Sequence, residues 1–312
     1  MKKKDVLGCV GGGAFILIAS VLIPFIGPFL SLLAPLPFLY YSAKLGIYQG
    51  LLLAALGTLT IGLFAKLTGY PQMIIFCAEF SLLGIALSEL FRRKLDFGQT
   101  VFFATVFMLS LGLVFLSFLA LSKGMGPLEM TLKYLQAQLT ATIEAYKGVG
   151  IPQENAIELA AYGKAFIDTI SKIYPSLMII GTGFAVWLNV VIAKPLFRMG
   201  NLAYPSFTPG DQWKAPDILV WGVIVAGFAL FLSSGGIELL AINVLIVIMV
   251  IYLFHGLSIV LFFLNKYHAP SWLRIGVYFL IIIQQLFFLL LALAGLFDQW
   301  IDFRKIHRKM EI

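Results

Sequence analysis

Glu79 is the side chain whose position says most about possible chemistry. It lies about two helical turns into the apolar stretch Met73–Phe91. Ionisable groups are costly inside a bilayer, so each one is a functional-site hypothesis by default. A carboxylate here could line a cavity and bind a cationic or hydrogen-bonding ligand. A protonated acid bonded to a neighbouring helix, or a hydrated side chain near the interface, fits equally well, so these interpretations stay open.

His255 also lies inside an apolar stretch, whereas His268 and His307 sit in or beside polar loops. A hydrogen bond to a neighbouring helix is the favoured interpretation of His255, ahead of a ligand or a proton shuttle. Hydrogen bonds between helices are likewise expected for the neutral polar residues of apolar stretches, which are Asn189, Asn243, Gln284 and Gln285.

Signatures of soluble enzymes are absent from the sequence. It contains no phosphate-binding Gly-x-x-x-x-Gly-Lys-Ser/Thr loop, no Gly-x-Ser-x-Gly elbow and no His-Glu-x-x-His pair. Cys9 and Cys77 have no Cys or His partner at metal-binding spacing. We therefore expect no catalytic residues, no metal site and no cofactor, and we expect that the chain is not an enzyme.

The composition requires a membrane. Of the 312 residues, 61% are hydrophobic and only 12% are charged, whereas soluble domains carry about 25% charged residues. A helix crosses the bilayer with about 20 apolar residues. Eight stretches reach or approach this length: Val6–Phe25, Ile47–Ala65, Met73–Phe91, Thr100–Leu121, Ile173–Phe197, Ile218–Leu232, Leu239–Leu264 and Trp272–Leu296.

A ninth stretch, Phe29–Ala43, is short and contains Pro35 and Pro37, so it is either a kinked span or a re-entrant segment. The sequence thus predicts an all-α polytopic membrane protein with about nine transmembrane helices, or eight. The bilayer is the expected environment, and no nucleic-acid partner is expected.

Basic residues predict a cytoplasmic N-terminus, because they gather at what would be the inner ends of nine spans. These residues are Lys2, Lys3, Lys4, Lys44, Arg92, Arg93, Lys94, Lys194, Arg198, Lys214, Lys266 and Arg274. The basic tail, with Arg304, Lys305, Arg308 and Lys309, disagrees, because an odd number of spans places it outside.

The polar insertion 123–170 is expected to form an amphipathic helical hairpin on the outer face. Its three lysines oppose five carboxylates from residue 124 onward, a net charge of −2. A first helix should start at Pro127, and a second should run from about Pro152 toward Pro175, with a turn at 147–152. Packing of both apolar faces within the protein is favoured over a membrane surface or a protein partner.

Small residues predict faces where helices approach closely. In the stretch beginning near residue 46 they recur every four residues, and the first stretch contains a shorter Gly-x-x-x-Gly version. Packing within one chain is favoured over docking of another subunit. The residues concerned are Gly8, Gly12, Gly46, Gly50, Ala54, Thr58 and Gly62.

The first stretches carry a family resemblance. Pro24-Phe25-Ile26-Gly27-Pro28-Phe29-Leu30, Ala34-Pro35-Leu36-Pro37 and the Gly46/Gly50 helix resemble the opening of substrate-binding S components of energy-coupling-factor (ECF) transporters. The whole chain is similar to the YybS-like bacterial membrane proteins of unknown function, which are related to those components. The overlap with S components covers Val6–Phe197.

This resemblance implies a six-helix core over 1–122 and 171–198 within a single membrane domain 1–312. Helices in 216–297 are then three additions, followed by the basic tail 298–312. A small molecule would bind near Pro24–Pro28 and Thr68–Gln72, above Glu79. The candidate ligand-binding residues are Glu79, Gln72, Tyr70 and Asn189.

The leading functional hypothesis is a subunit of S-component type in the bacterial cytoplasmic membrane that binds a small, vitamin-like molecule. It would need a separate ATPase or coupling subunit, because the chain has no phosphate loop. The alternative is a non-transporting scaffold or regulator that binds proteins through its outer hairpin and small-residue faces. An independent ion-coupled carrier would require paired buried charges or broken helices, and the sequence indicates one buried carboxylate.

Overall fold

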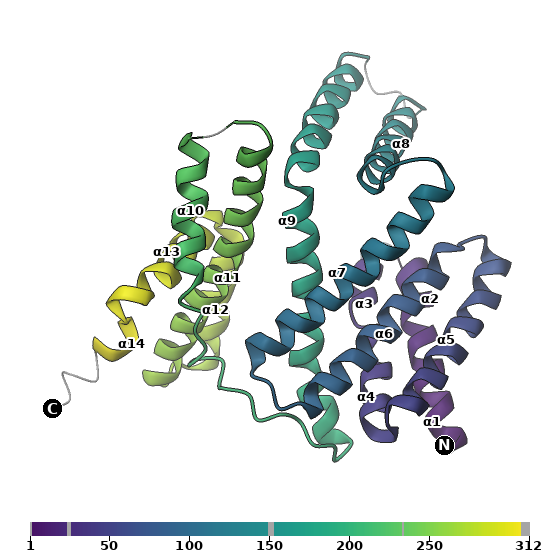
Figure 1. The fold of residues 1–312 in the computed structure, drawn as a ribbon, viewed down its shortest axis with the longest axis horizontal. Helices are drawn as coiled ribbons and strands as arrows, with labels where there is room; N and C mark the ends of the chain where they lie inside the picture. Colours follow the sequence, from purple (N-terminus) through teal and green to yellow (C-terminus); the bar gives the residue numbers. More distant parts are fainter. Residues whose placement is uncertain (1, 24–25, 149–152, 233, 307–312) are drawn as a thin grey trace. The chain divides into compact units, whose positions relative to one another are not determined.

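The computed structural model describes residues 2–23, 26–148, 153–232 and 234–306, and helix is the regular secondary structure of these ranges (Figure 1). The elements in chain order are α1 Lys3–Val6, the π-helical turn η1 Leu7–Gly11, α2 Gly12–Leu22, α3 Gly27–Ser31, α4 Pro35–Leu45, α5 Ile47–Thr68, α6 Gln72–Arg92, α7 Phe97–Ser122, α8 Pro127–Gly148, α9 Gln153–Met199, α10 Leu219–Leu232, α11 Gly236–Lys266, α12 Ser271–Ile283, α13 Gln285–Ile301 and α14 Phe303–Ile306. The predicted all-α fold is confirmed.

Within the described residues, six helical segments are long and apolar enough to cross a membrane. They are Lys3–Leu22, Ile47–Thr68, Gln72–Arg92, Phe97–Ser122, Ala161–Met199 and Gly236–Lys266. The α12 and α13 pair gives a seventh if the two count as one span. The remaining two expected spans correspond to shorter helices, α3 with α4 and α10, and the total of nine crossings stays a prediction.

The expected single helix over 272–296 is wrong. The chain bends by 103° between α12 and α13, where Gln284 takes an extended backbone with φ −99° and ψ 102°. Neither proline nor glycine marks the bend. Packing of α13 against α11, described below, fixes the direction of α13, so tertiary contacts rather than local sequence account for the break.

The chain divides into two compact units. Unit 1 contains the residues up to Ser171 together with Gly181–Ser206, and unit 2 contains Lys172–Ile180 together with the residues from Phe207 onward. The expected additional helices of 216–297 fall in unit 2.

The core of unit 1 is built around Phe38 of α4, whose side chain is 2% exposed. Glycines on three other helices surround it. A Cβ atom added to Gly13 of α2, Gly57 of α5 or Gly84 of α6 would lie within 3.0 Å of Phe38 side-chain atoms. The absence of a side chain at these positions therefore lets four helices meet at one aromatic ring.

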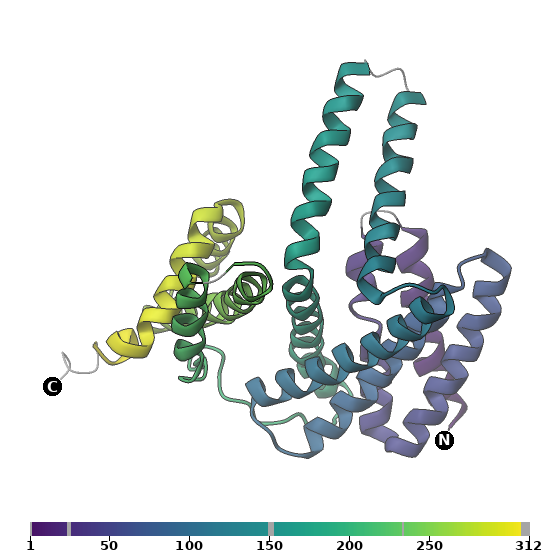
Figure 2. The same cartoon turned by 45° about the horizontal axis from the view of Figure 1, so that its top comes forward.

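The hairpin of unit 1 consists of α8 and the first part of α9, which lie side by side in Figures 1 and 2. The first helix begins at Pro127, as predicted. Leu139 of α8 packs on Gly163 of α9, where an added Cβ would lie 2.5 Å from the leucine Cδ1. The predicted turn at 147–152 lies mostly outside the described residues.

Pro175 does not end the hairpin helix, which is a second departure from the sequence expectation. α9 continues through it for 47 residues in all, about 70 Å at 1.5 Å per residue. A proline inside a helix removes one N–H, and its ring disturbs the preceding turn. The broken turn must therefore find other hydrogen-bond partners.

Asn243 of α11 supplies those partners. Its Oδ1 accepts a hydrogen bond from the Ser176 backbone N–H at 2.9 Å, and its Nδ2 donates to the Lys172 carbonyl at 2.7 Å. These are the two groups that an unbroken helix would join directly. The expectation that Asn243 forms an interhelical hydrogen bond is confirmed.

Unit 2 contains a helix that is short for a membrane. α10 has 14 residues, about 21 Å, whereas the hydrocarbon core is about 30 Å thick. The segment before it, from Phe207 to Ile218, has no helix. Non-helical backbone at membrane depth needs hydrogen-bond partners from protein or water.

Candidate functional site

Glu79 lies on α6, half-buried, on the side facing α7. A Cβ added to Gly112 of α7 would lie 3.9 Å from the Glu79 Oε1 atom. Within the described part of the chain, the Glu79 carboxyl group has no hydrogen bond and no ion pair. A carboxyl group inside an apolar helix without a protein partner is available to a ligand or a proton.

The other predicted ligand-binding residues are placed differently. Tyr70 and Gln72 are exposed, just before α6 and at its first residue. Asn189 is fully buried, and its Nδ2 donates to the carbonyls of Leu32 at 2.7 Å and Ala185 at 2.8 Å. Leu32 follows α3 and precedes α4, so Asn189 bonds a carbonyl at that break. Its Oδ1 atom has no partner among the described residues, which leaves one acceptor for a ligand.

The predicted packing residues fall into two groups: most lie at contacts between helices, and one forms a turn. Gly8 lies against the Tyr41 hydroxyl, and Gly50 lies against Ser42. Gly46 instead has a φ of +100° with nothing near it, so it forms the turn between α4 and α5.

The remaining members of this set lie along α2 and α5. Gly12 faces Pro37 at 3.6 Å and Gly62 faces Ile74 at 3.9 Å. Ala54 is 6% exposed and accepts the Thr58 hydroxyl hydrogen bond at its carbonyl.

A cluster of charged side chains is buried in unit 2, where the sequence indicated only His255. The close crossing of α11 and α13 brings it together. A Cβ added to Gly256 would collide with the Leu291 carbonyl, and one added to Gly295 would collide with the Tyr252 carbonyl. Two glycines thus let the helix backbones touch, and their neighbours His255 and Asp298 meet as a result.

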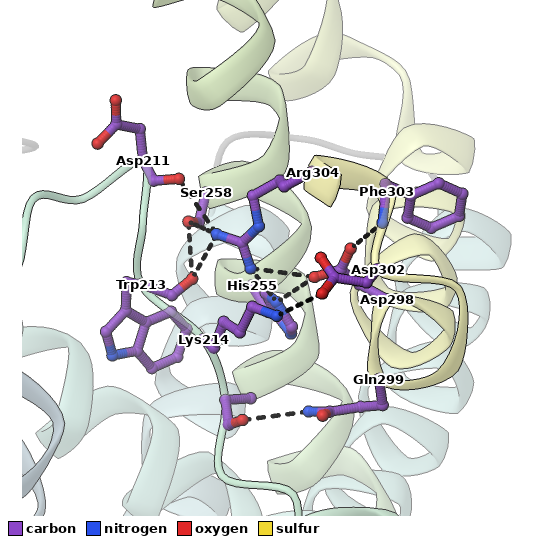
Figure 3. Close-up of polar contacts among 11 residues, drawn as sticks. Asp211, Trp213, Lys214, His255, Ser258, Asp298, Gln299, Asp302, Phe303 and Arg304 are labelled. Atoms are coloured by element: carbon purple, nitrogen blue, oxygen red, sulfur yellow. Dashed lines mark hydrogen bonds and ion pairs between the residues drawn. The ribbon is translucent and has the colours of Figure 1, made fainter. Parts of the chain in front are cut away.

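Three atoms form the centre of this cluster (Figure 3). His255 Nε2 lies 3.1 Å from Asp298 Oδ2, Arg304 Nη2 lies 3.0 Å from the same oxygen, and Arg304 Nη2 lies 2.9 Å from His255 Nε2. The three residues are 0%, 1% and 7% exposed. The second Asp298 oxygen, Oδ1, accepts the Phe303 backbone N–H at 2.8 Å.

A neutral imidazole cannot satisfy all three edges of this triangle. A proton on Nε2 donates to Asp298 but opposes the Arg304 N–H, whereas a proton on Nδ1 lets Nε2 accept from Arg304 but leaves two acceptors in contact. Nδ1 itself has no partner among the described residues. The tautomer of His255 therefore decides which of these edges is hydrogen-bonded.

The same cluster satisfies the non-helical segment before α10. Arg304 Nη1 donates to the Asp211 and Trp213 carbonyls, both at 3.1 Å. The Ser258 hydroxyl also donates to the Trp213 carbonyl, at 2.8 Å, and Gln299 donates to the Ala215 carbonyl at 3.1 Å (Figure 3). Every second carbonyl from residue 211 to 215 thus receives a side-chain hydrogen bond.

This geometry favours structure over catalysis. The Ser258 hydroxyl donates to a backbone carbonyl and accepts from Arg304 at 3.3 Å, so it is not aligned with His255 as a nucleophile. Among the described residues, no group of three His, Cys, Asp or Glu side chains could hold a metal ion. The cluster fastens the 207–217 segment to α11 and α13.

Sequence reasoning missed Asp298 and Arg304 because both were assigned to the basic tail 298–312. Asp298 belongs to α13 and is buried, so the expectation of a single buried carboxylate is wrong. A usable signal exists in the chain: Asp298 directly follows an apolar stretch and is itself followed by Arg304. Two opposite charges at that spacing, together with a histidine inside another helix, indicate a buried ion pair.

Comparison with known proteins places the chain in a family. The sequence model described as "Predicted membrane protein (DUF2232)" matches residues 13–299. The "Uncharacterized protein YybS" of Bacillus subtilis (strain 168) is 23% identical over 296 residues, which is 93% of each chain. No solved structure matches this chain.

Proposed function

Because the chain belongs to the DUF2232 family of predicted membrane proteins, we propose that it binds a small solute in the bacterial cytoplasmic membrane and takes part in its transport. The single observation that carries this proposal is the Glu79 carboxyl group, which lies inside the α6 span without a described protein partner. The proposed role is binding rather than catalysis, and the N-terminus is proposed to be cytoplasmic.

The Glu79 environment limits the class of solute. Burying a carboxyl group without a hydrogen bond is unfavourable, so a ligand that satisfies it gains affinity from that interaction. Hydrogen-bond donors and cations are the groups that a carboxylate accepts. A solute with an amine, amide or hydroxyl donor fits this requirement.

Energy for transport would come from elsewhere in this proposal. The chain has no phosphate-binding loop, and its first helices resemble those of S components, which dock onto a coupling subunit and an ATPase. We therefore propose a subunit of such an assembly, with unit 1 as the solute-binding part. Its first helix has Gly8-x-x-x-Gly12 where S components have Ala-x-x-x-Ala.

The proposal can be tested by native mass spectrometry of the protein purified in lipid nanodiscs from bacterial membranes. The wild type should retain a specific compound, and Glu79→Gln should lose it. Glu89→Gln is the matched control, because Glu89 lies on the same helix but pairs with Arg92 at 3.1 Å. This control should retain the compound.

Thermal stability separates loss of binding from loss of fold. Without ligand, Glu79→Gln should unfold at the same or a higher temperature than the wild type, because a neutral amide is less costly to bury than a carboxylate. Equal retention of the compound by Glu79→Gln and Glu89→Gln would remove Glu79 from the site. No enriched compound in the wild type would argue against solute binding altogether.

A second candidate function, a scaffold that binds other proteins, is favoured by the hairpin surface. Tyr134 of α8, and Tyr162 and Phe166 of α9, are 64%, 67% and 62% exposed. The last two stand four residues apart on one helix face. Co-purification of a stoichiometric protein that is lost in a Tyr162→Ser, Phe166→Ser variant, with no bound compound, would favour this function.

A further inference from the structure

Unit 2 contains a cavity of about 340 Å³ at the N-terminal end of α10, beside the last residues of α13. Its lining has two indoles, one carboxylate, one amide and two aliphatic side chains. These residues are Asp217, Val220, Trp221, Ile224, Gln299 and Trp300. Among the residues that the structure describes, no basic side chain lines the cavity.

Two basic side chains of the described part of unit 2 pair with carboxylates other than Asp217. Lys214 lies 3.6 Å from Asp302, and Arg304 lies 3.0 Å from Asp298. Asp217 has no ion pair within the described residues. No described side chain therefore neutralises its negative charge.

The amide of Gln299 is held in place as an acceptor. Its Nε2 atom donates to the Ala215 carbonyl at 3.1 Å, and its amide oxygen has the capacity to accept a hydrogen bond from a ligand. The Asp217 carboxylate and the Gln299 amide oxygen thus provide hydrogen-bond acceptors and a negative charge. This composition selects against anions and favours cations.

The two indoles favour an organic cation over a metal ion. Trp221 and Trp300 are 66% and 61% exposed, so their rings are accessible. Tryptophan is the strongest partner for an ammonium group through the cation–π interaction. Val220 and Ile224 add apolar surface for methyl groups. Tryptophans also gather at membrane interfaces without binding a ligand, but a carboxylate in the same cavity is not needed for that role.

We propose that this cavity binds an alkylated ammonium group, held by the Asp217 carboxylate and the Trp221 and Trp300 indoles. The group belongs either to a free solute or to a lipid headgroup, and both present the same chemistry. The site consists of unit 2 residues only and is independent of the binding proposed at Glu79.

The probe is tetramethylammonium chloride, titrated into the full-length protein in phosphatidylglycerol nanodiscs while tryptophan fluorescence is recorded. Sodium chloride at equal ionic strength provides the baseline, since salt alone weakens the interactions between exposed charges. The wild type should show a saturable change. Asp217→Asn should raise the dissociation constant at least tenfold, and Trp300→Leu at least threefold.

Trp272→Leu is the control for nonspecific quenching, because Trp272 of α12 is 74% exposed and lies outside the cavity. It should leave the dissociation constant unchanged. Asp217→Asn is nearly isosteric, and an unchanged unfolding temperature shows that the variant folds. An absent saturable change in the wild type, or equal dissociation constants in the wild type and Asp217→Asn, overturns the proposal.

Nanodiscs of phosphatidylcholine distinguish the two sources of the cation. A lipid headgroup that occupies the cavity should compete with tetramethylammonium and raise its apparent dissociation constant relative to phosphatidylglycerol. A site for a free solute should give the same constant in both lipids. Either result supports the cation site, provided that the Asp217→Asn effect is present.

Discussion

Asn243 is predicted to replace the backbone hydrogen bond that is interrupted next to Pro175 in α9. Replacing Asn243 with alanine removes its hydrogen bonds to the Ser176 N–H and the Lys172 carbonyl. Membrane hydrogen bonds of this kind contribute about 0.6 to 1.7 kcal/mol each, so we expect the free energy of unfolding to fall by about 1 to 3 kcal/mol.

The double mutant makes the prediction specific. Pro175→Ala restores the missing N–H and removes the ring, so Ser176 and Lys172 can bond to each other as in an ordinary helix. In the Pro175→Ala background, Asn243→Ala should lower the free energy of unfolding by less than about 1 kcal/mol. We therefore expect a coupling energy of about 1 to 2 kcal/mol, whereas independent sites add to within about 0.5 kcal/mol.

The assay is equilibrium unfolding by SDS in mixed micelles, applied to the wild type, both single variants and the double variant. Asn189→Ala, with and without Pro175→Ala, is the control. Asn189 is also a buried asparagine that bonds backbone carbonyls, but its partners are Leu32 and Ala185. Its effect should be additive with that of Pro175→Ala. An equal cost of Asn243→Ala in both backgrounds would refute the proposed role of Asn243.

Three further predictions concern the buried cluster, helix packing and topology. Asp298→Asn should lower the free energy of unfolding by about 3 to 5 kcal/mol, because it leaves Arg304 buried without its carboxylate; a smaller loss in SDS unfolding than in a surface-pair control such as Glu129→Gln would contradict this. Gly84→Ala should lower the free energy of unfolding by about 1 to 3 kcal/mol in the same assay, since the new Cβ would lie 2.6 Å from the Pro35 carbonyl oxygen. Gly62→Ala is the control, because the nearest atom to its new Cβ lies at 3.9 Å, and it should leave the stability unchanged. Lys123→Cys should react with an impermeant maleimide on intact cells, while the buried native cysteines stay unlabelled; labelling only after permeabilisation would reverse the predicted orientation.

The helical fold could be predicted from sequence because lipid imposes strong constraints. Long apolar segments with few charges must satisfy their backbone internally, which leaves the α-helix as the local solution. The start of α8 at Pro127 was also readable, because proline suits the first turn of a helix. These features depend on residues close together in the chain.

The continuation of α9 through Pro175 and the bend at Gln284 could not be predicted from the sequence. A proline normally indicates a helix boundary, yet α9 passes through Pro175 because Asn243, distant in sequence, bonds the interrupted turn. Conversely, nothing local marks the bend at Gln284. At Pro175 a contact with another helix overrides the local preference, and at Gln284 such a contact decides the outcome where the local sequence is neutral.

Glu79 was identified from sequence because a carboxyl group in an apolar helix stands out by composition alone. In the structure, the Glu79 carboxyl group has no partner among the described residues. Asn189 donates a hydrogen bond to the Leu32 carbonyl at the break after α3. The structure also showed that Arg304, assigned from sequence to a tail, is buried against Asp298 and His255.

What the sequence by itself determined is the solvent: a chain with 61% hydrophobic residues and 12% charged residues must fold in lipid, as helices. What only the tertiary structure decided is which polar groups meet. Hydropathy is a sum over neighbouring residues, whereas a hydrogen bond depends on atoms brought to about 3 Å of each other. In unit 2 that distance is set by Gly256 and Gly295, whose missing side chains allow α11 and α13 to touch.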